Sequence, residues 1–98
     1  MHAPKGYWII ECQEITDQIS MQKYANAWAE IVNEFNAQII GGTQSSIFVE
    51  GPPKARVLIL EFPSYQVAQD CYYSEKYQKA KELALNAMKR TFSIIEGI

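Results

Sequence analysis

The sequence predicts a small α+β domain in which helices cover one face of an antiparallel sheet. Segments rich in β-branched and aromatic residues, typical of strands, alternate with segments whose apolar residues recur at helical spacing. The 98 residues, 48% of them hydrophobic and 20% charged, suffice for one hydrophobic core and exclude a disordered chain. We therefore expect residues 1–98 to form a single domain.

Four segments have the composition of strands. They are residues 7–15, 38–50, 56–62 and 91–96. The second segment is interrupted by Gly41 and Gly42, which predict a bend or bulge. Because Pro52 and Pro53 lack backbone donors, residues 51–54 predict the turn of a hairpin between the second and third strands.

A long helix is predicted between the first and second strands. It follows a cap at Thr16 or Asp17, whose side-chain oxygens can accept a hydrogen bond from the first turn. Its apolar stripe, at three- and four-residue spacing, consists of Met21, Tyr24, Trp28, Ile31, Val32 and Phe35.

Two further helices are predicted between the third and fourth strands. Ser64 caps a short helix over residues 65–73, and Ser74 caps a longer one. The apolar stripe of the longer helix consists of Tyr77, Ala80, Leu83, Ala84, Ala87 and Met88. Lys89 and Arg90 are expected in its last turn, where positive charge is favourable.

The resulting β-α-β-β-α-β order is the ferredoxin-like arrangement. In it the strands pair antiparallel in the order 4-1-3-2. Both crossovers share one handedness, so the helices cover the same face of the sheet.

Both faces of the two central strands are apolar, although the helices can cover only one. Alternation along the first strand separates Trp8, Ile10 and Cys12 from Tyr7 and Ile9, and alternation along the third strand separates Leu58, Leu60 and Phe62 from Val57 and Ile59. Each large apolar side chain left in water forgoes about 1.5–3 kcal/mol of burial free energy. We therefore predict a homodimer whose two sheets face each other as a dimeric α/β barrel. The alternative is that Tyr7 and Ile9 are isolated apolar residues on the surface of a monomer.

The charge and the first residues argue against several classes of protein. Eleven acidic and nine basic residues give a net charge of −2 at pH 7, which disfavours binding to nucleic acid or anionic lipid. Residues 1–6 lack the apolar core of a secretory signal, and the apolar run at residues 57–60 is too short to span a bilayer. The sequence therefore predicts a soluble, cytoplasmic protein with no nucleic-acid or membrane partner.

Short motifs along almost the whole chain carry a family resemblance. They are KGYW at residues 5–8, Asp17, Tyr24, EG at 50–51, RVLILEFPS at 56–64, Tyr72, Ser74, YQ at 77–78, AK at 80–81 and IEG at 95–97. With these motifs the chain resembles the domain of unknown function 1330 family, within the dimeric α/β-barrel superfamily. The resemblance implies this fold and a homodimer but no agreed reaction, although the superfamily includes cofactor-independent monooxygenases, haem-handling proteins and muconolactone isomerases. Two basic residues of the family are missing, since residues 83–85 and Ile40 stand in their places. The resemblance therefore implies no anion-binding role through those positions.

Antiparallel pairing brings Glu61 and Glu96 beside the start of the first strand, where Trp8 lies. The strands that carry the two glutamates are two strand spacings apart, roughly 9–10 Å, which suits opposite sides of a pocket. A carboxylate among indole and phenol groups can act as a general base, because burial raises its pKa. Glu61 and Glu96 are therefore candidate catalytic residues, and Trp8, Tyr72 and Tyr77 are candidate ligand-binding residues. The alternative is that the glutamates are solvated strand ends and the tyrosines belong to the edge of the core.

Other chemistry-bearing residues have structural explanations. Cys12 and Cys71 have no CxxC pairing and no plausible nearby base, so we expect two reduced, buried thiols rather than a metal ligand or a nucleophile. Glu11 and Arg56 are expected to form a cross-strand ion pair. No motif for flavin, nicotinamide, haem or metal occurs in the sequence, so we expect no cofactor.

Two functions remain open from the sequence. One is a small enzyme of the cofactor-independent monooxygenase or isomerase type that acts on a small, partly apolar molecule. The other is a non-catalytic dimer that binds a small ligand or has a regulatory role. An RNA-recognition module shares the order of elements, but the third strand offers only aliphatic residues at positions 57–60 for base stacking.

Overall fold

A computed structural model describes residues 3–42 and 45–98. Its elements follow the predicted order: β1 (Gly6–Cys12), α1 (Gln18–Ile31), β2 (Gln38–Gly41), β3 (Arg56–Phe62), α2 (Tyr65–Tyr73), α3 (Glu75–Ala87) and β4 (Arg90–Glu96). The four strands form one antiparallel sheet in the order β2-β3-β1-β4, which confirms the predicted ferredoxin-like topology.

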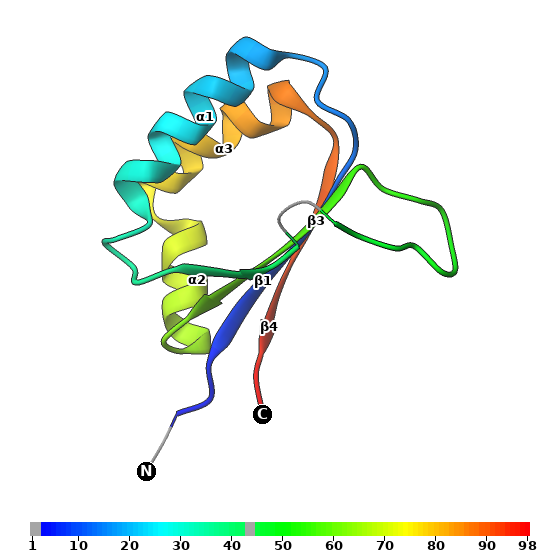
Figure 1. The fold of residues 1–98 in the computed structure, drawn as a ribbon. Helices are drawn as coiled ribbons and strands as arrows, with labels where there is room; N and C mark the ends of the chain where they lie inside the picture. Colours follow the sequence, from blue (N-terminus) through cyan, green and yellow to red (C-terminus); the bar gives the residue numbers. More distant parts are fainter. Residues whose placement is uncertain (1–2, 43–44) are drawn as a thin grey trace.

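The helices lie together on one face of this sheet (Figure 1). α1 and α3 pack side by side over the end where β1 finishes, and α2 packs against the other end of β1, β3 and β4 (Figure 1). Asp17, Ser64 and Ser74 cap α1, α2 and α3, because each side chain accepts a hydrogen bond from a backbone N–H of the first turn. The three predicted caps are confirmed.

Trp8 is the centre of the core between the helices and the sheet. Its side chain is 0% exposed, and its Nε1 donates a hydrogen bond to the carbonyl oxygen of Ala68 in α2 at 2.9 Å. Its ring centroid lies within 5.5 Å of those of Trp28, Phe62, Tyr77 and Phe92. Contacts among large aromatic rings therefore hold α1, α3, β3 and β4 to β1.

The first strand and the first helix are shorter than predicted. β1 ends at Cys12 rather than at residue 15, because the chain beyond it bonds to the last residue of α3 and to the segment that follows. The N–H of Gln13 donates to the carbonyl oxygen of Lys89 at 2.8 Å, and that of Thr16 to the carbonyl oxygen of Ala87 at 2.7 Å. Helix α1 ends at Ile31, before the last residue of its predicted stripe.

The prediction of a strand over residues 38–50 is wrong in its second half. β2 ends at Gly41, residues 45–55 form no strand, and positions 43 and 44 lie outside the described residues. The predicted bulge is confirmed by a shift of register between Ile39 and Gly41. Gly42 follows with a φ of 80°, and a Cβ there would collide with the carbonyl oxygen of Val57. The backbone therefore turns away from β3 at a position that only glycine can occupy.

Residues 45–55 extend as an arm on the side of the sheet away from the helices (Figure 1). Two apolar side chains of this arm, Ile47 and Val49, are 89% and 83% exposed. On the sheet itself, side chains of the face without helices are only partly covered, and these include Tyr7, Ile9, Val57, Ile59 and Ile95. Apolar residues on both faces of the sheet are thus confirmed.

Within the described ranges, no helix combines the length and the hydropathy needed to cross a bilayer.

Candidate functional site

One end of the sheet brings two arginines together. Cys12, the last residue of β1, is paired with Arg56, the first residue of β3, and with Arg90, the first residue of β4. Residues that are paired across antiparallel strands place their side chains on the same face. Arg56, Cys12 and Arg90 therefore form one row on the face that the helices cover, and we call it the arginine row.

The arginine row lines a cavity of about 400 Å³ between the sheet and α1. Its apolar lining includes side chains from β1, β3, α1 and the segment after α3, among them Ile10, Leu58, Met21 and Met88. Residues 13–15 between β1 and α1 form part of the rim, where Glu14 is exposed. The cavity thus combines an apolar wall with two guanidinium groups.

Arg90 is held by aromatic neighbours. Its Nη2 donates a hydrogen bond to the hydroxyl oxygen of Tyr77 at 3.1 Å, and the hydroxyls of Tyr77 and Tyr24 are hydrogen-bonded at 2.9 Å. Its guanidinium carbon lies 5.6 Å from the ring centroid of Tyr24 and 5.0 Å from that of Phe92, which are distances of cation–π contact. Burial opposes the charge of Arg90, but the tyrosine oxygens outweigh it and place the pKa above its usual value. The guanidinium is therefore a fixed cation.

Arg56 has a different environment, because part of its guanidinium has no partner. Its Nε is the only buried side-chain nitrogen or oxygen without a hydrogen bond among the described residues. Within residues 3–42 and 45–98, the salt bridges are Lys76–Glu34 and Lys79–Glu75. Neither arginine of the row is therefore paired with a carboxylate of these residues. A buried donor without a partner costs about 1–3 kcal/mol, and such a group calls for an explanation.

Both cysteines are buried and free, as predicted. Burial raises the pKa of the Cys12 thiol, although Arg90 and Arg56 act in the opposite direction. Burial raises the pKa of Cys71 to about 12. Both side chains are therefore protonated thiols at neutral pH, and Cys12 brings no negative charge to the arginine row.

The aromatic residues predicted to bind a ligand do come together, but mostly inside the core. The ring centroids of Trp8 and Tyr72 are 6.2 Å apart, those of Trp8 and Tyr77 are 4.9 Å apart, and those of Tyr72 and Tyr77 are 5.5 Å apart. Trp8 and Tyr77 are 0% exposed, whereas Tyr72 lines a shallow hollow with Phe92 and Ile94. Burial raises the pKa of Tyr77 above its usual value, so its phenol remains protonated.

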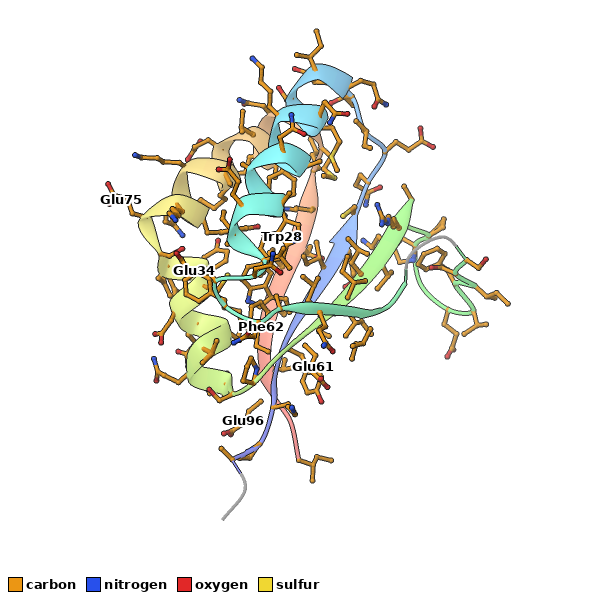
Figure 2. The ribbon with its side chains drawn as sticks, turned by 60° about the vertical axis from the view of Figure 1, so that its left-hand side comes forward. Trp28, Glu34, Glu61, Phe62, Glu75 and Glu96 are labelled. Atoms are coloured by element: carbon orange, nitrogen blue, oxygen red, sulfur yellow. The ribbon has the colours of Figure 1, made fainter. Side chains whose placement is uncertain are left out.

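The two predicted catalytic glutamates lie at the end of the sheet opposite the arginine row (Figure 2). Glu61 is paired with Tyr7 and Glu96 with Gly6, and adjacent residues of β1 face opposite sides of the sheet. The expectation that they flank one pocket is therefore wrong. Glu61 is on the face without helices, where its Oε2 accepts a hydrogen bond from the hydroxyl of Tyr7 at 3.3 Å. Loss of solvent and the negative charge of Glu61 raise the pKa of Tyr7.

The expected ion pair between Glu11 and Arg56 is absent from the described residues. The register pairs Glu11 with Val57 and pairs Arg56 with Cys12, so the two charged side chains are on opposite faces. Arg90 is also misplaced in the prediction, since α3 ends at Ala87 and Arg90 begins β4.

The arginine row was detectable in the sequence. In antiparallel pairing, the third and fourth strands end beside the start of the first strand. For the same reason, the third and fourth strands begin beside the end of the first strand. At that end of the sheet, the same pairing places Arg56 and Arg90 on either side of Cys12. No cluster of histidine, cysteine and carboxylate side chains in residues 3–42 and 45–98 could hold a metal ion.

Replacing Tyr77 with phenylalanine tests the hydroxyl network that holds Arg90. We expect Tyr77→Phe to lower the free energy of unfolding by about 1–3 kcal/mol, because Arg90 and Tyr24 lose a buried partner. Urea unfolding followed by tryptophan fluorescence measures the change. The matched control Tyr73→Phe removes a hydroxyl from an exposed side chain of α2 and should change stability by less than about 0.5 kcal/mol. Equal effects of the two substitutions would show that the buried network contributes nothing.

Solved structures of similar fold come from several kinds of protein. A protein of unknown function from Rhodopseudomonas palustris matches with a TM-score of 0.76 at 11% identity, over 99% of this chain and 85% of that one. A dimeric protein of unknown function and ferredoxin-like fold from Bacteroides fragilis matches with a TM-score of 0.59 at 12% identity, over 98% of this chain and 99% of that one. SnoaB, a cofactor-independent oxygenase from Streptomyces nogalater, matches with a TM-score of 0.55 at 5% identity, over 95% of this chain and 92% of that one. At these identities the likeness shows the fold alone.

A comparison with curated proteins finds no match. The family model described as domain of unknown function DUF1330 matches residues 5–98, which is nearly the whole chain. The chain therefore belongs to the DUF1330 family.

Proposed function

We propose that this chain forms a homodimer that binds a small, partly apolar molecule in the cavity beside the arginine row. The observation that best supports ligand binding is that the cavity combines apolar walls with two guanidinium groups. Neither guanidinium forms a salt bridge with a carboxylate of the described residues. A volume of about 400 Å³ is within the range of small-molecule sites, which are largely apolar with a few polar groups that orient the ligand.

The chemistry of the lining favours binding over catalysis. A general base must be unprotonated at the working pH and must lie within reach of the ligand. Cys12 is a protonated thiol, and the buried Tyr77 behind Arg90 is a protonated phenol. The carboxylate of the lining, Glu14, is exposed at the rim. Among the described residues, the cavity therefore has groups that can hold a ligand but no desolvated carboxylate to take a proton from it.

Three observations support the homodimer. Tyr7, Ile9 and Ile59 form an apolar surface on the face without helices, and such a surface is typical of an interface. The exposed arm of residues 45–55 extends on that same side (Figure 1), where it could reach a second copy. A solved neighbour of ferredoxin-like fold is dimeric. We propose that two sheets pack face to face, which leaves the helix-covered cavity of each chain on the outside of the interface.

A charge placed on the face without helices should prevent dimerisation. We expect the unmodified chain to sediment at twice its 11.2 kDa mass and Ile59→Glu to sediment as a monomer, because a carboxylate would be buried in the interface. Analytical ultracentrifugation at micromolar concentration measures both, and circular dichroism checks that the variant is folded. The matched control Ile19→Glu, at a 71% exposed position of α1, should remain a dimer. A folded wild-type chain that sediments only as a monomer would refute the assembly.

Filling the cavity should weaken ligand binding. Met21 and Met88 both line the cavity, so their ¹³C-labelled methyl groups report its occupancy by NMR. We expect both signals to shift on addition of 1-octanol or octanoate, and Met21→Trp to weaken binding by more than about tenfold, since the indole would occupy the space. Gln22→Trp, at the next and exposed position of α1, is the control. If neither probe moves the two methyl signals, the cavity is not a binding site.

The second candidate function is an enzyme of the cofactor-independent monooxygenase or isomerase type. The similarity of fold to a cofactor-independent oxygenase supports it. Its catalytic residue would be Glu61, on the face without helices beside Tyr7, because Glu96 and the core residues Trp8, Tyr72 and Tyr77 belong to the other face. Glu61 and its hydrogen-bonded Tyr7 lie on the face that the dimer would cover, so a site there would be shielded from solvent.

Replacing the carboxyl of Glu61 tests this second function. A ligand that co-purifies with the protein, identified by native mass spectrometry, would serve as the substrate in oxygen-consumption and product assays. We expect Glu61→Gln to abolish turnover, because an amide cannot act as a base, and Glu82→Gln on the exposed surface of α3 to retain it. Unchanged turnover in Glu61→Gln would remove this residue from the mechanism.

A further inference from the structure

We infer that the ligand of the cavity is an amphiphile with one carboxylate on an aliphatic body, and that the carboxylate lies between Arg56 and Arg90. This inference rests on the proposed binding function and names the chemistry of its ligand. It stands on the geometry of the arginine row, on the unpartnered nitrogen of Arg56, and on the charge at this end of the sheet.

The arginine row places two long cationic side chains on either side of a short neutral one. Arg56 and Arg90 occupy strands that flank β1, so their backbones are two strand spacings apart, roughly 9–10 Å. Cys12 between them is small and protonated, which leaves space and adds no negative charge. A bound carboxylate can therefore accept hydrogen bonds from both guanidinium groups while its chain extends along the apolar wall of Met21, Leu58 and Met88.

The number of free donors suits a carboxylate. Arg90 already donates one N–H to Tyr77, whereas the Nε of Arg56 is buried without a partner. Arginine binds carboxylates with a planar pair of donors, one of which is often Nε–H. Because the Nε is shielded from solvent, a carboxylate would reach it only after the guanidinium turns toward the cavity. It would then satisfy this donor and neutralise charge that no side chain of the described residues neutralises.

The charge around this end of the sheet favours an anion. Lys54 and Lys89 lie next to the row, where they line a neighbouring hollow with Arg90. Two glutamates also lie here: Glu11 lines the same hollow, although it is on the opposite face from Arg56, and Glu14 is exposed at the rim of the cavity. A ligand anion therefore meets a local excess of positive charge, although the chain as a whole is acidic.

Calorimetric titration with three matched probes tests the inference: octanoate, octanamide and octyl phosphate. We expect the unmodified dimer to bind octanoate at least about tenfold more tightly than octanamide, which has the same shape and no charge. Octyl phosphate should bind no more tightly than octanoate. Equal affinity for octanoate and octanamide would overturn the inference, and so would a clear preference for the phosphate.

Substitutions of Arg56 connect this preference to the row. Arg56→Gln should weaken octanoate binding by about tenfold or more and leave octanamide binding unchanged. Arg56→Lys keeps the charge but loses the planar pair of donors, so its affinity for octanoate should be intermediate. The matched control Lys54→Gln removes a neighbouring positive charge outside the cavity and should change the affinity by less than about threefold. If Lys54→Gln weakens octanoate binding as much as Arg56→Gln does, the effect is general electrostatics and the inference fails.

Failure of this inference differs from failure of the proposed function. If octanoate and octanamide both move the methyl signals of Met21 and Met88 with equal affinity, the cavity binds apolar molecules and the carboxylate assignment is wrong. If no probe moves these signals, the binding function itself is wrong. Arg56→Lys keeps a positive charge at this position, so it gives an answer even if Arg56→Gln fails to fold.

Discussion

The register of β1 against β3 and β4 is the constraint on which both proposed surfaces depend. It places Cys12 between Arg56 and Arg90 at one end of the sheet, and Trp8 between Leu60 and Ile94 in the core. A shift of one residue would exchange the faces, move the arginines away from the helices and expose the indole. The register is itself held by Trp8, whose ring packs against aromatic residues from both long helices and both neighbouring strands. The packing of the core thus determines where the charged side chains lie.

The two faces of the sheet have separate roles in the proposed function. The helix-covered face contains the core and, beyond it, the cavity beside the arginine row, where α1 and the sheet leave space between them. The other face carries partly exposed apolar side chains and the projecting arm of residues 45–55 (Figure 1). Because the proposed interface and the cavity are on opposite faces, the dimer can form with each ligand site complete within one chain. This separation distinguishes the binding function from the enzymatic one, whose candidate Glu61 lies on the interface face.

Much of the fold could be predicted because its signals are local. The helix caps at Asp17, Ser64 and Ser74 and the alternation in β1 and β3 need only neighbouring residues, and all are confirmed. The extent of the second strand could not be predicted, because Gly42 turns the chain away through a close approach to Val57, which is distant in sequence. The candidate site was harder still. The sequence predicts Glu61 and Glu96 at the correct end of the sheet but does not predict that they lie on opposite faces, since facing depends on the register to a single residue. Local signals predict Arg90 at a helix end and Arg56 in an ion pair, whereas the row that they form with Cys12 depends on the pairing of distant strands.

The most direct test of the central claim is a crystal structure of the protein with 8-bromooctanoate, in which anomalous diffraction locates the bromine. We expect the carboxylate to lie within hydrogen-bonding distance of the Nε of Arg56 and the guanidinium of Arg90, and the bromine to lie beside Met21 or Met88. A bromine in the hollow beside Tyr72, or on the face without helices, would contradict it.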